Sequence, residues 1–303
     1  MDQYMIAMMN ISSSKAIKLW DKLNRQIETL SMIIKLEEEV FIRHREIRCT
    51  KLGDGKWSPG ERKKIRRELS RGLTNYILED EEEKLLRVIF ARDYSYTAEA
   101  DLAKLLSFCR RLPDSDEWLP KEKARSIKRF RQISEEIEAC LHQNGYVNLD
   151  GLLAFRLEEY RNDLKETVDY AVDEYLLDKQ YQEFISLLKY FVFIQKSKVS
   201  SVHLLHKGDS NFVLLNEKLE PMHPSVAGGE ITMETLEKEL NFEDIIVSTL
   251  ITVAPARIYI HSHTPELPVI KTIRQIFEDR ACLCDCKMCN LLDSERAQDH
   301  ILT

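Results

Sequence analysis

Apolar residues change their spacing along the chain, and these changes divide it into three sections. In residues 1–57, a short apolar run over residues 3–9 precedes side chains at helical spacing, namely Ile17, Trp20, Leu23, Ile27 and Leu30. Apolar residues then stand among charges in residues 33–51, a pattern that favours one or two strands. We expect a small strand–helix–strand unit, ended by the turn residues Gly53–Asp54–Gly55.

Residues 58–199 follow a helical pattern almost throughout. Ser58, Pro59 and Glu61 form a helix start signal, with a capping residue followed by proline and then an acid. The pattern breaks at residues 93–97, 113–120 and 144–150. Residues 155–195 contain almost no turn chemistry, which predicts one or two long helices. Near the end of this segment one apolar stripe comprises Phe184, Leu187, Leu188 and Phe191.

Residues 200–303 mix the strand and helix patterns. Two β-rich runs, 202–206 and 212–215, flank a four-residue loop that contains glycine, and this arrangement predicts a hairpin. The pattern then predicts a helix at 243–253, a strand at 257–261, a helix at 268–279 and a strand at 281–284. The last three elements suggest a right-handed βαβ unit. The three sections together predict an α+β fold: a small N-terminal α/β unit, a long helical middle and a C-terminal α/β unit.

Composition narrows the class of protein. Hydrophobic residues make up 44% and charged residues 31%, an ordinary globular balance. No run approaches the roughly 20 apolar residues that cross a bilayer, and the first residues lack the basic region of a signal peptide. We therefore expect a cytoplasmic protein without membrane insertion. The formal net charge of −7 argues against a general nucleic-acid coat.

Two basic helical stretches, residues 62–71 and 121–131, leave a local contact with nucleic acid open. Acidic runs at residues 79–83 and 135–138 offer partners within the chain. We therefore favour a solvated, salt-bridged helix surface, with a nucleic-acid-binding module as a third functional class.

The densest chemical signal lies near the C-terminus, where four of the seven cysteines fall within residues 282–289. If the strands at 257–261 and 281–284 pair in parallel, histidines at the end of the first approach these cysteines. The carboxyl ends of strands in open α/β units are the usual place for ligands. Thiolates and imidazoles are the groups that zinc prefers. The predicted zinc site comprises His261, His263, Cys284, Cys286 and Cys289.

Other interpretations of the same residues stay open. Four cysteines within eight residues are too close in sequence to surround one tetrahedral ion without strain, which favours structural or free cysteines. Cys286 and Cys289 alone have the spacing of a redox dithiol. The chain has no Walker A loop, dinucleotide fingerprint or serine elbow. The alternative function is a metal-dependent enzyme, acting on phosphodiesters, with its site between the βαβ unit and the hairpin that carries His203 and His206.

Several segments carry a family resemblance: residues 155–160, 168–176, 181–192 and 246–251, together with Cys286–Cys289. They resemble the YtxC family of sporulation proteins from endospore-forming bacteria. The resemblance covers about residues 150–290 and implies a process rather than a reaction. The expected function is therefore that of a cytosolic, non-enzymatic sporulation factor that acts through protein contacts.

Overall fold

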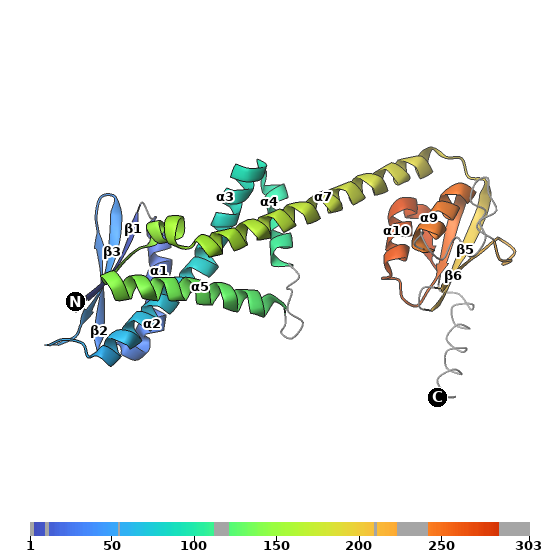
Figure 1. Cartoon of the computed structure of the whole chain (residues 1–303). Helices are drawn as coiled ribbons and strands as arrows, with labels where there is room; N and C mark the ends of the chain where they lie inside the picture. Colours follow the sequence, from blue (N-terminus) through green and yellow to red (C-terminus); the bar gives the residue numbers. More distant parts are fainter. Residues whose placement is uncertain are drawn as a thin grey trace, which may run out of the picture. The chain divides into compact units, whose positions relative to one another are not determined.

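The computed structural model describes residues 3–9, 12–53, 55–111, 121–208, 211–222 and 242–284. The chain forms two compact units, Met1–Leu177 and Asp178–Thr303, each of which is described by itself. Figure 1 labels their helices and strands. The division into residues 1–57, 58–199 and 200–303 that the sequence suggests stays a prediction.

The first unit contains a four-stranded sheet in the order β2-β3-β1-β4. Its strands are β1 (Gln3–Met9), β2 (Ile34–Val40), β3 (His44–Lys51) and β4 (Tyr146–Asn148). β1 and β2 both pair antiparallel with β3, which confirms strands in residues 33–51, whereas β4 pairs in parallel with β1. The sequence pattern did not predict β4, because a strand of three residues is too short to show an alternating pattern.

Two capped helices pack beside this sheet. α1 (Ser13–Ile27) begins after Ser12, and α2 (Pro59–Tyr76) begins after Ser58. The Glu61 N–H donates to the Ser58 hydroxyl at 3.2 Å, and the Ser58 N–H donates to the Glu61 carboxylate at 2.6 Å. This reciprocal capping box satisfies two backbone donors and confirms the predicted helix start.

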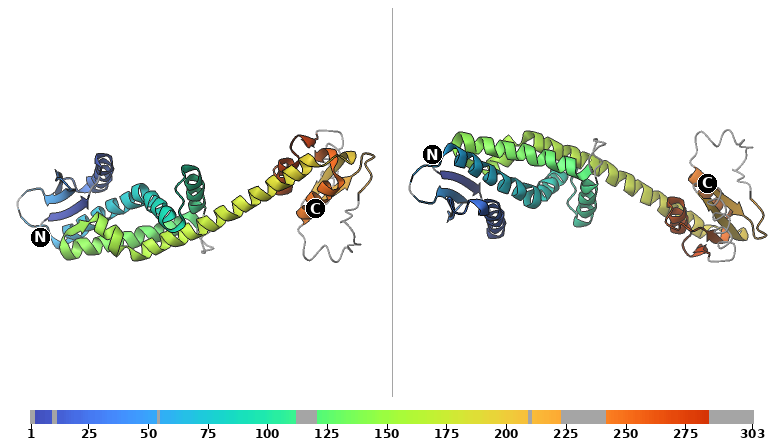
Figure 2. Two further views of the ribbon diagram at one scale, coloured as in Figure 1. Left: turned by 90° about the horizontal axis from the view of Figure 1, so that it is seen from above. Right: turned by 90° about the horizontal axis from the view of Figure 1, so that it is seen from below.

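The remaining helices of the unit follow the predicted breaks. A π-helical turn (Ile77–Glu81) leads from α2 into α3 (Glu82–Tyr94), which ends where Ser95 adopts a left-handed conformation with φ 61°. The further helices are α4 (Glu99–Arg110), α5 (Lys121–Asn144), α6 (Leu149–Gly151) and α7 (Glu158–Ile194). The breaks at residues 93–97 and 144–150 are confirmed, whereas residues 113–120 lie outside the described residues. Figure 2 shows α5 alongside the first half of α7.

α7 confirms the long helix predicted within residues 155–195 and contains 37 residues. Neither α7 nor any other helix in the described part of the chain is long and apolar enough to cross a membrane.

A buried polar network joins α3, α5 and α7. The Arg129 guanidinium is 8% exposed and donates to Glu82 at 2.6 Å, Asp163 at 2.5 Å and Thr167 at 2.7 Å. Arg125 donates to Asp163 as well, at 3.2 Å. Burial disfavours the ionised carboxylate of Asp163, yet the two arginines hold its pKa below its ordinary value. Two of the basic residues in 121–131 are therefore paired within the chain.

The second unit contains a four-stranded sheet in the order β6-β5-β7-β8. Its strands are β5 (Val199–Gly208), β6 (Asn211–Leu215), β7 (Pro255–His261) and β8 (Ala281–Leu283). β5 and β6 form the predicted antiparallel hairpin, and β7 and β8 pair in parallel as the two strands of the predicted βαβ unit.

Among its described residues, the second unit contains the end of α7 and the helices α9 (Phe242–Val253) and α10 (Pro268–Phe277), the latter two close to their predicted bounds. α10 is the connection between β7 and β8. Ile258 and Ile260 of β7 share a buried core with Ile270 and Ile273 of α10, and all four side chains are 0% exposed. This packing supports one face of the strands that carry the histidines.

Candidate functional site

The candidate site lies in the second sheet, where the carboxyl end of β7 pairs in parallel with the middle of β5. β5 pairs in parallel with β7, so that His203 lies opposite Tyr259 and Leu205 lies opposite His261. Side chains two residues apart on a strand share a face. The register therefore places His203, Tyr259 and His261 on one face of the sheet, where the carboxyl end of β7 lies beside the middle of β5.

Two imidazole rings meet on this face of the sheet. His203 Nδ1 lies 3.0 Å from His261 Nε2, and the two ring centroids are 5.2 Å apart in a stacked arrangement. The Tyr259 ring stacks on the other histidine, His203, with centroids 5.1 Å apart. His261 is 1% exposed, so one member of the pair is fully buried.

Burial favours the uncharged form of both histidines. Loss of water contact lowers the pKa of His203, and it lowers the pKa of His261 together with the nearby His203 charge. Two neutral imidazoles satisfy each other because one ring donates a proton to the acceptor nitrogen of the other. The neutral imidazole is also the form that binds a metal ion.

Of the five residues of the predicted zinc site, three lie within the described part of the chain. His261 ends β7, whereas His263 lies beyond the strand and is exposed. The Cys284 N–H donates to the Ile260 carbonyl at 2.8 Å, which continues the β7–β8 ladder past Leu283 and sets Cys284 beside His261. Cys286 and Cys289 lie outside the described residues. Within the described ranges, no group of three or more histidine, cysteine or acidic residues is arranged to hold a metal ion. The zinc site stays a prediction.

The sequence pattern placed His203 in the hairpin, beside the alternative enzyme site, but did not predict its pairing with His261. The two residues are 58 positions apart, and only the adjacency of β5 and β7 brings them together. His206 is placed by the same adjacency, because its Nδ1 lies 3.0 Å from the Ser262 hydroxyl beyond β7. The alternation of side chains along each strand, which can be read from the sequence, shows which residues share a face. It predicts a contact between two strands only when the order of the strands in the sheet is known.

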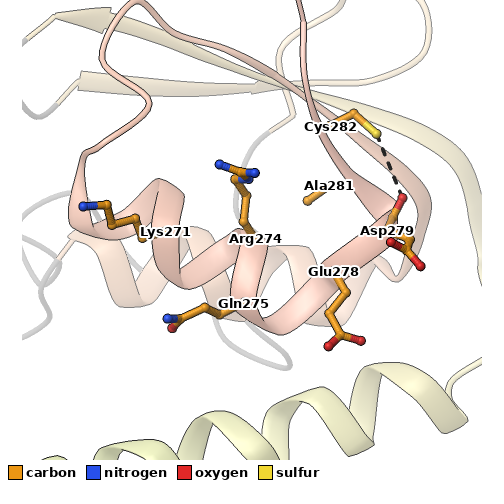
Figure 3. A pocket seen from close by; sticks show the side chains of 7 residues that line it. All are labelled: Lys271, Arg274, Gln275, Glu278, Asp279, Ala281 and Cys282. Carbon is orange, nitrogen blue, oxygen red and sulfur yellow. Dashed lines mark hydrogen bonds between the residues drawn. The ribbon is translucent and has the colours of Figure 1, made fainter.

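A shallow pocket lies between α10, the turn that follows it and the start of β8 (Figure 3). It is lined by Lys271, Arg274, Gln275, Glu278, Asp279, Ala281 and Cys282. The Cys282 thiol donates to the Asp279 carbonyl at 3.9 Å, the contact drawn in Figure 3. Two basic and two acidic side chains line the pocket, so their balance favours neither an anion nor a cation.

The second half of α7 carries a second candidate feature, an exposed apolar surface. Ile185 and Val192 are buried in the core of the second unit. Six large side chains elsewhere on the helix are each between 53% and 62% exposed, and we call them the α7 stripe: Leu177, Phe184, Leu187, Tyr190, Phe191 and Ile194. A single exposed apolar residue is ordinary, whereas large exposed apolar patches are typical of interaction sites.

Comparisons with known proteins place the chain in a family. The model of the YtxC-like family matches residues 67–281. A curated relative, the uncharacterized protein YtxC of Bacillus subtilis (strain 168), is 22% identical over 209 residues, which cover 69% of this chain and 73% of the relative. No solved structure gives a significant match. The matched region includes most of the helices of the first unit and the sheet of the second, and the chain belongs to the YtxC-like family.

Proposed function

We propose that this protein takes part in endospore formation and acts through contacts with protein rather than through catalysis. The resemblance of residues 155–192 to a sporulation family supports the process. The α7 stripe supports the mode of action and is the observation that carries the proposal.

Apolar side chains that are exposed to water favour association with a partner that covers them. Each Å² of apolar surface that leaves water contributes about 25 cal/mol to association. Aromatic side chains are enriched in the buried centres of protein interfaces, and three of the six stripe residues are aromatic: Phe184, Tyr190 and Phe191. Covering the α7 stripe therefore contributes more binding free energy to a complex with a protein partner than covering an ordinary charged surface does.

The test is a count of heat-resistant spores in the host of this protein. Deletion of the gene is expected to lower the count, and expression of the unsubstituted protein is expected to restore it. The double variant Phe184→Glu/Phe191→Glu is expected to fail in restoration, because it places two charges within the α7 stripe. Phe193→Glu is the matched control, since Phe193 is a phenylalanine on the same helix, 80% exposed and outside the stripe. An undiminished spore count after deletion contradicts the proposed process.

The second candidate function is that of a zinc-dependent enzyme acting on phosphodiesters, and the pair of His203 and His261 supports it. A tetrahedral zinc ion with Zn–N distances of about 2.0–2.1 Å separates two ligating nitrogens by about 3.3 Å. The two histidine nitrogens are 3.0 Å apart, close to this separation. Binding of an ion requires the donor ring to carry its proton on its other nitrogen and both rings to turn their free nitrogens toward the ion. Cys284 lies beside His261, and Cys286 and Cys289 follow it in the sequence as further thiolate ligands.

Metal analysis of the purified protein tests this candidate. The expected result is about one equivalent of zinc per chain, lost in His261→Ala and in Cys286→Ser. His203→Ala and His263→Ala form a matched pair: loss of zinc in the first but not in the second assigns the ligand to the strand β5. A stably folded protein that contains no metal after purification contradicts the candidate.

A further inference from the structure

The α7 stripe has the spacing of a coiled-coil seam. Leu177, Phe184 and Phe191 follow one another at intervals of seven residues. Leu187 and Ile194 are also seven apart, and Gln180 precedes them at the same interval. The two series interleave in steps of three and four, as the a and d positions of a heptad do. Tyr190 precedes Phe191 and flanks the seam.

This seam is separate from the helix face that the second unit uses for its own core. With 3.6 residues per turn, the centre of the seam lies about 120° around α7 from Ile185 and Val192. Those two side chains are each 4% exposed and belong to the buried core of the second unit. The Tyr181 hydroxyl of the same helix lies 3.0 Å from the Thr272 hydroxyl of α10. The seam can therefore take a partner without displacing any contact of that core.

We infer that the α7 stripe pairs with the α7 stripe of a second copy of this chain, in a parallel and in-register two-stranded coiled coil. The inference rests on the proposed mode of action through protein contacts and names the partner. A second copy fits because it presents the same seam, of the same length and spacing, to the first.

The exposed area matches what a stable dimer needs. An aromatic side chain buries roughly 150–250 Å², so six side chains that are each just over half exposed present on the order of 600 Å² per copy. Pairing two copies then removes on the order of 1,200 Å² from water, above the roughly 1,000 Å² that a specific interface needs.

The charges along the seam permit self-association. Between residues 177 and 194 the charged side chains are Asp178, Lys179, Glu183 and Lys189, two acids and two bases. The whole chain carries a formal net charge of −7, so most surfaces of two copies repel each other more than this one does. The balanced segment therefore lets two copies approach without like-charge repulsion.

Gln180 selects the orientation of the two helices. In a parallel, in-register pair, each Gln180 faces its counterpart, and the two amides can hydrogen-bond because each has both donors and an acceptor. An antiparallel pair centred on the stripe sets Gln180 opposite Phe191, which leaves a polar group buried against an aromatic ring. A polar residue in an apolar seam sets register in this way in coiled coils.

Sedimentation equilibrium of the full chain tests the inference. The unsubstituted protein is expected to be a dimer. Phe184→Glu/Phe191→Glu is expected to raise the dimer dissociation constant by roughly a hundredfold or more, because two uncompensated charges enter each side of the seam. Phe193→Glu is expected to leave the dimer intact, since Phe193 projects from the other side of α7. Circular dichroism of each variant confirms that it folds.

A cross-link tests the orientation independently of the charge variants. The cross-link is made in a background in which the C-terminal cysteines at positions 282, 284, 286 and 289 are replaced by serine, because Cys282 is an exposed free thiol. In Gln180→Cys the two new thiols face each other in the parallel pair, so oxidation is expected to yield a covalent dimer that the background protein does not form. A monomer at all concentrations overturns the inference, including the case in which another segment of the same chain covers the stripe. A dimer that resists both glutamates, or one without the Gln180→Cys cross-link, overturns the assigned seam or its register. The spore count is a separate readout, so a normal count with an intact dimer contradicts only the proposed process.

Discussion

Replacing Arg129 with alanine is expected to lower the free energy of unfolding of the first unit by about 3 kcal/mol. The guanidinium is the shared donor to Glu82, Asp163 and Thr167, and it is 8% exposed. Its removal leaves two partly buried carboxylates with fewer partners, and an uncompensated charge inside a protein costs more than the intact ion pair contributes. Breaking a buried ion pair costs roughly 3–5 kcal/mol. The expected cost lies at the lower end of this range because Arg125 still pairs with Asp163 and Tyr160 still donates to Glu82.

Tryptophan fluorescence during chemical denaturation measures this change, because Trp20, Trp57 and Trp118 all belong to the first unit. Arg131→Ala is the matched control on the same helix. Arg131 pairs with Glu135, and its side chain is 78% exposed, so the loss is expected to stay below about 1 kcal/mol. Equal losses in the two variants would show that the buried network contributes no more than a surface ion pair.

Replacing Ile273 with alanine is expected to destabilise the second unit by about 3 kcal/mol. Ile273 lies at the centre of α10, is 0% exposed and shares a core with Ile258 and Ile260 of β7. Truncation removes buried apolar surface and leaves a cavity that the surrounding strands fill only in part. Because α10 connects β7 to β8, the same change weakens support for the part of the sheet that carries the pair of histidines.

Hydrogen exchange of the backbone amides in residues 255–283 measures this destabilisation, since buried strands exchange through opening of the whole unit. Ile273→Val removes a single methylene and is expected to cost about 0.5–1.5 kcal/mol. Gln275→Ala lies on the exposed side of the same helix and is expected to change stability by less than about 0.5 kcal/mol. Unchanged protection in Ile273→Ala would contradict the role of α10 as the main support of β7.

Local patterns in the sequence determined the elements of the fold. Ser58 and Glu61 start α2 through hydrogen bonds across three residues, and Ser95 ends α3 by its own backbone conformation. The hairpin of β5 and β6 and the βαβ unit of β7, α10 and β8 were predicted for the same reason. Caps, turns and apolar periodicity act over a few residues, so their physical cause is present in the sequence itself.

The α7 stripe shows where periodicity stops being informative. The sequence placed Phe184, Leu187, Leu188 and Phe191 in one apolar stripe. In the structure, Leu188 packs against the core with Ile185 and Val192, while the other three side chains are more than half exposed. The apolar side chains of this helix project from most of its circumference. Their spacing alone therefore does not show which side packs into the core.

By itself, the sequence determined the α+β class, the order of the elements from β5 to β8 that its pattern predicted and the end of β7 at His261, because neighbouring residues decide these features. Only the tertiary structure decided that β4 joins β1, that Arg129 meets Asp163 and that His203 meets His261. Each of these contacts joins residues more than thirty positions apart. Such contacts depend on which strands and helices become neighbours, a choice made by burial of the whole core rather than by any local pattern.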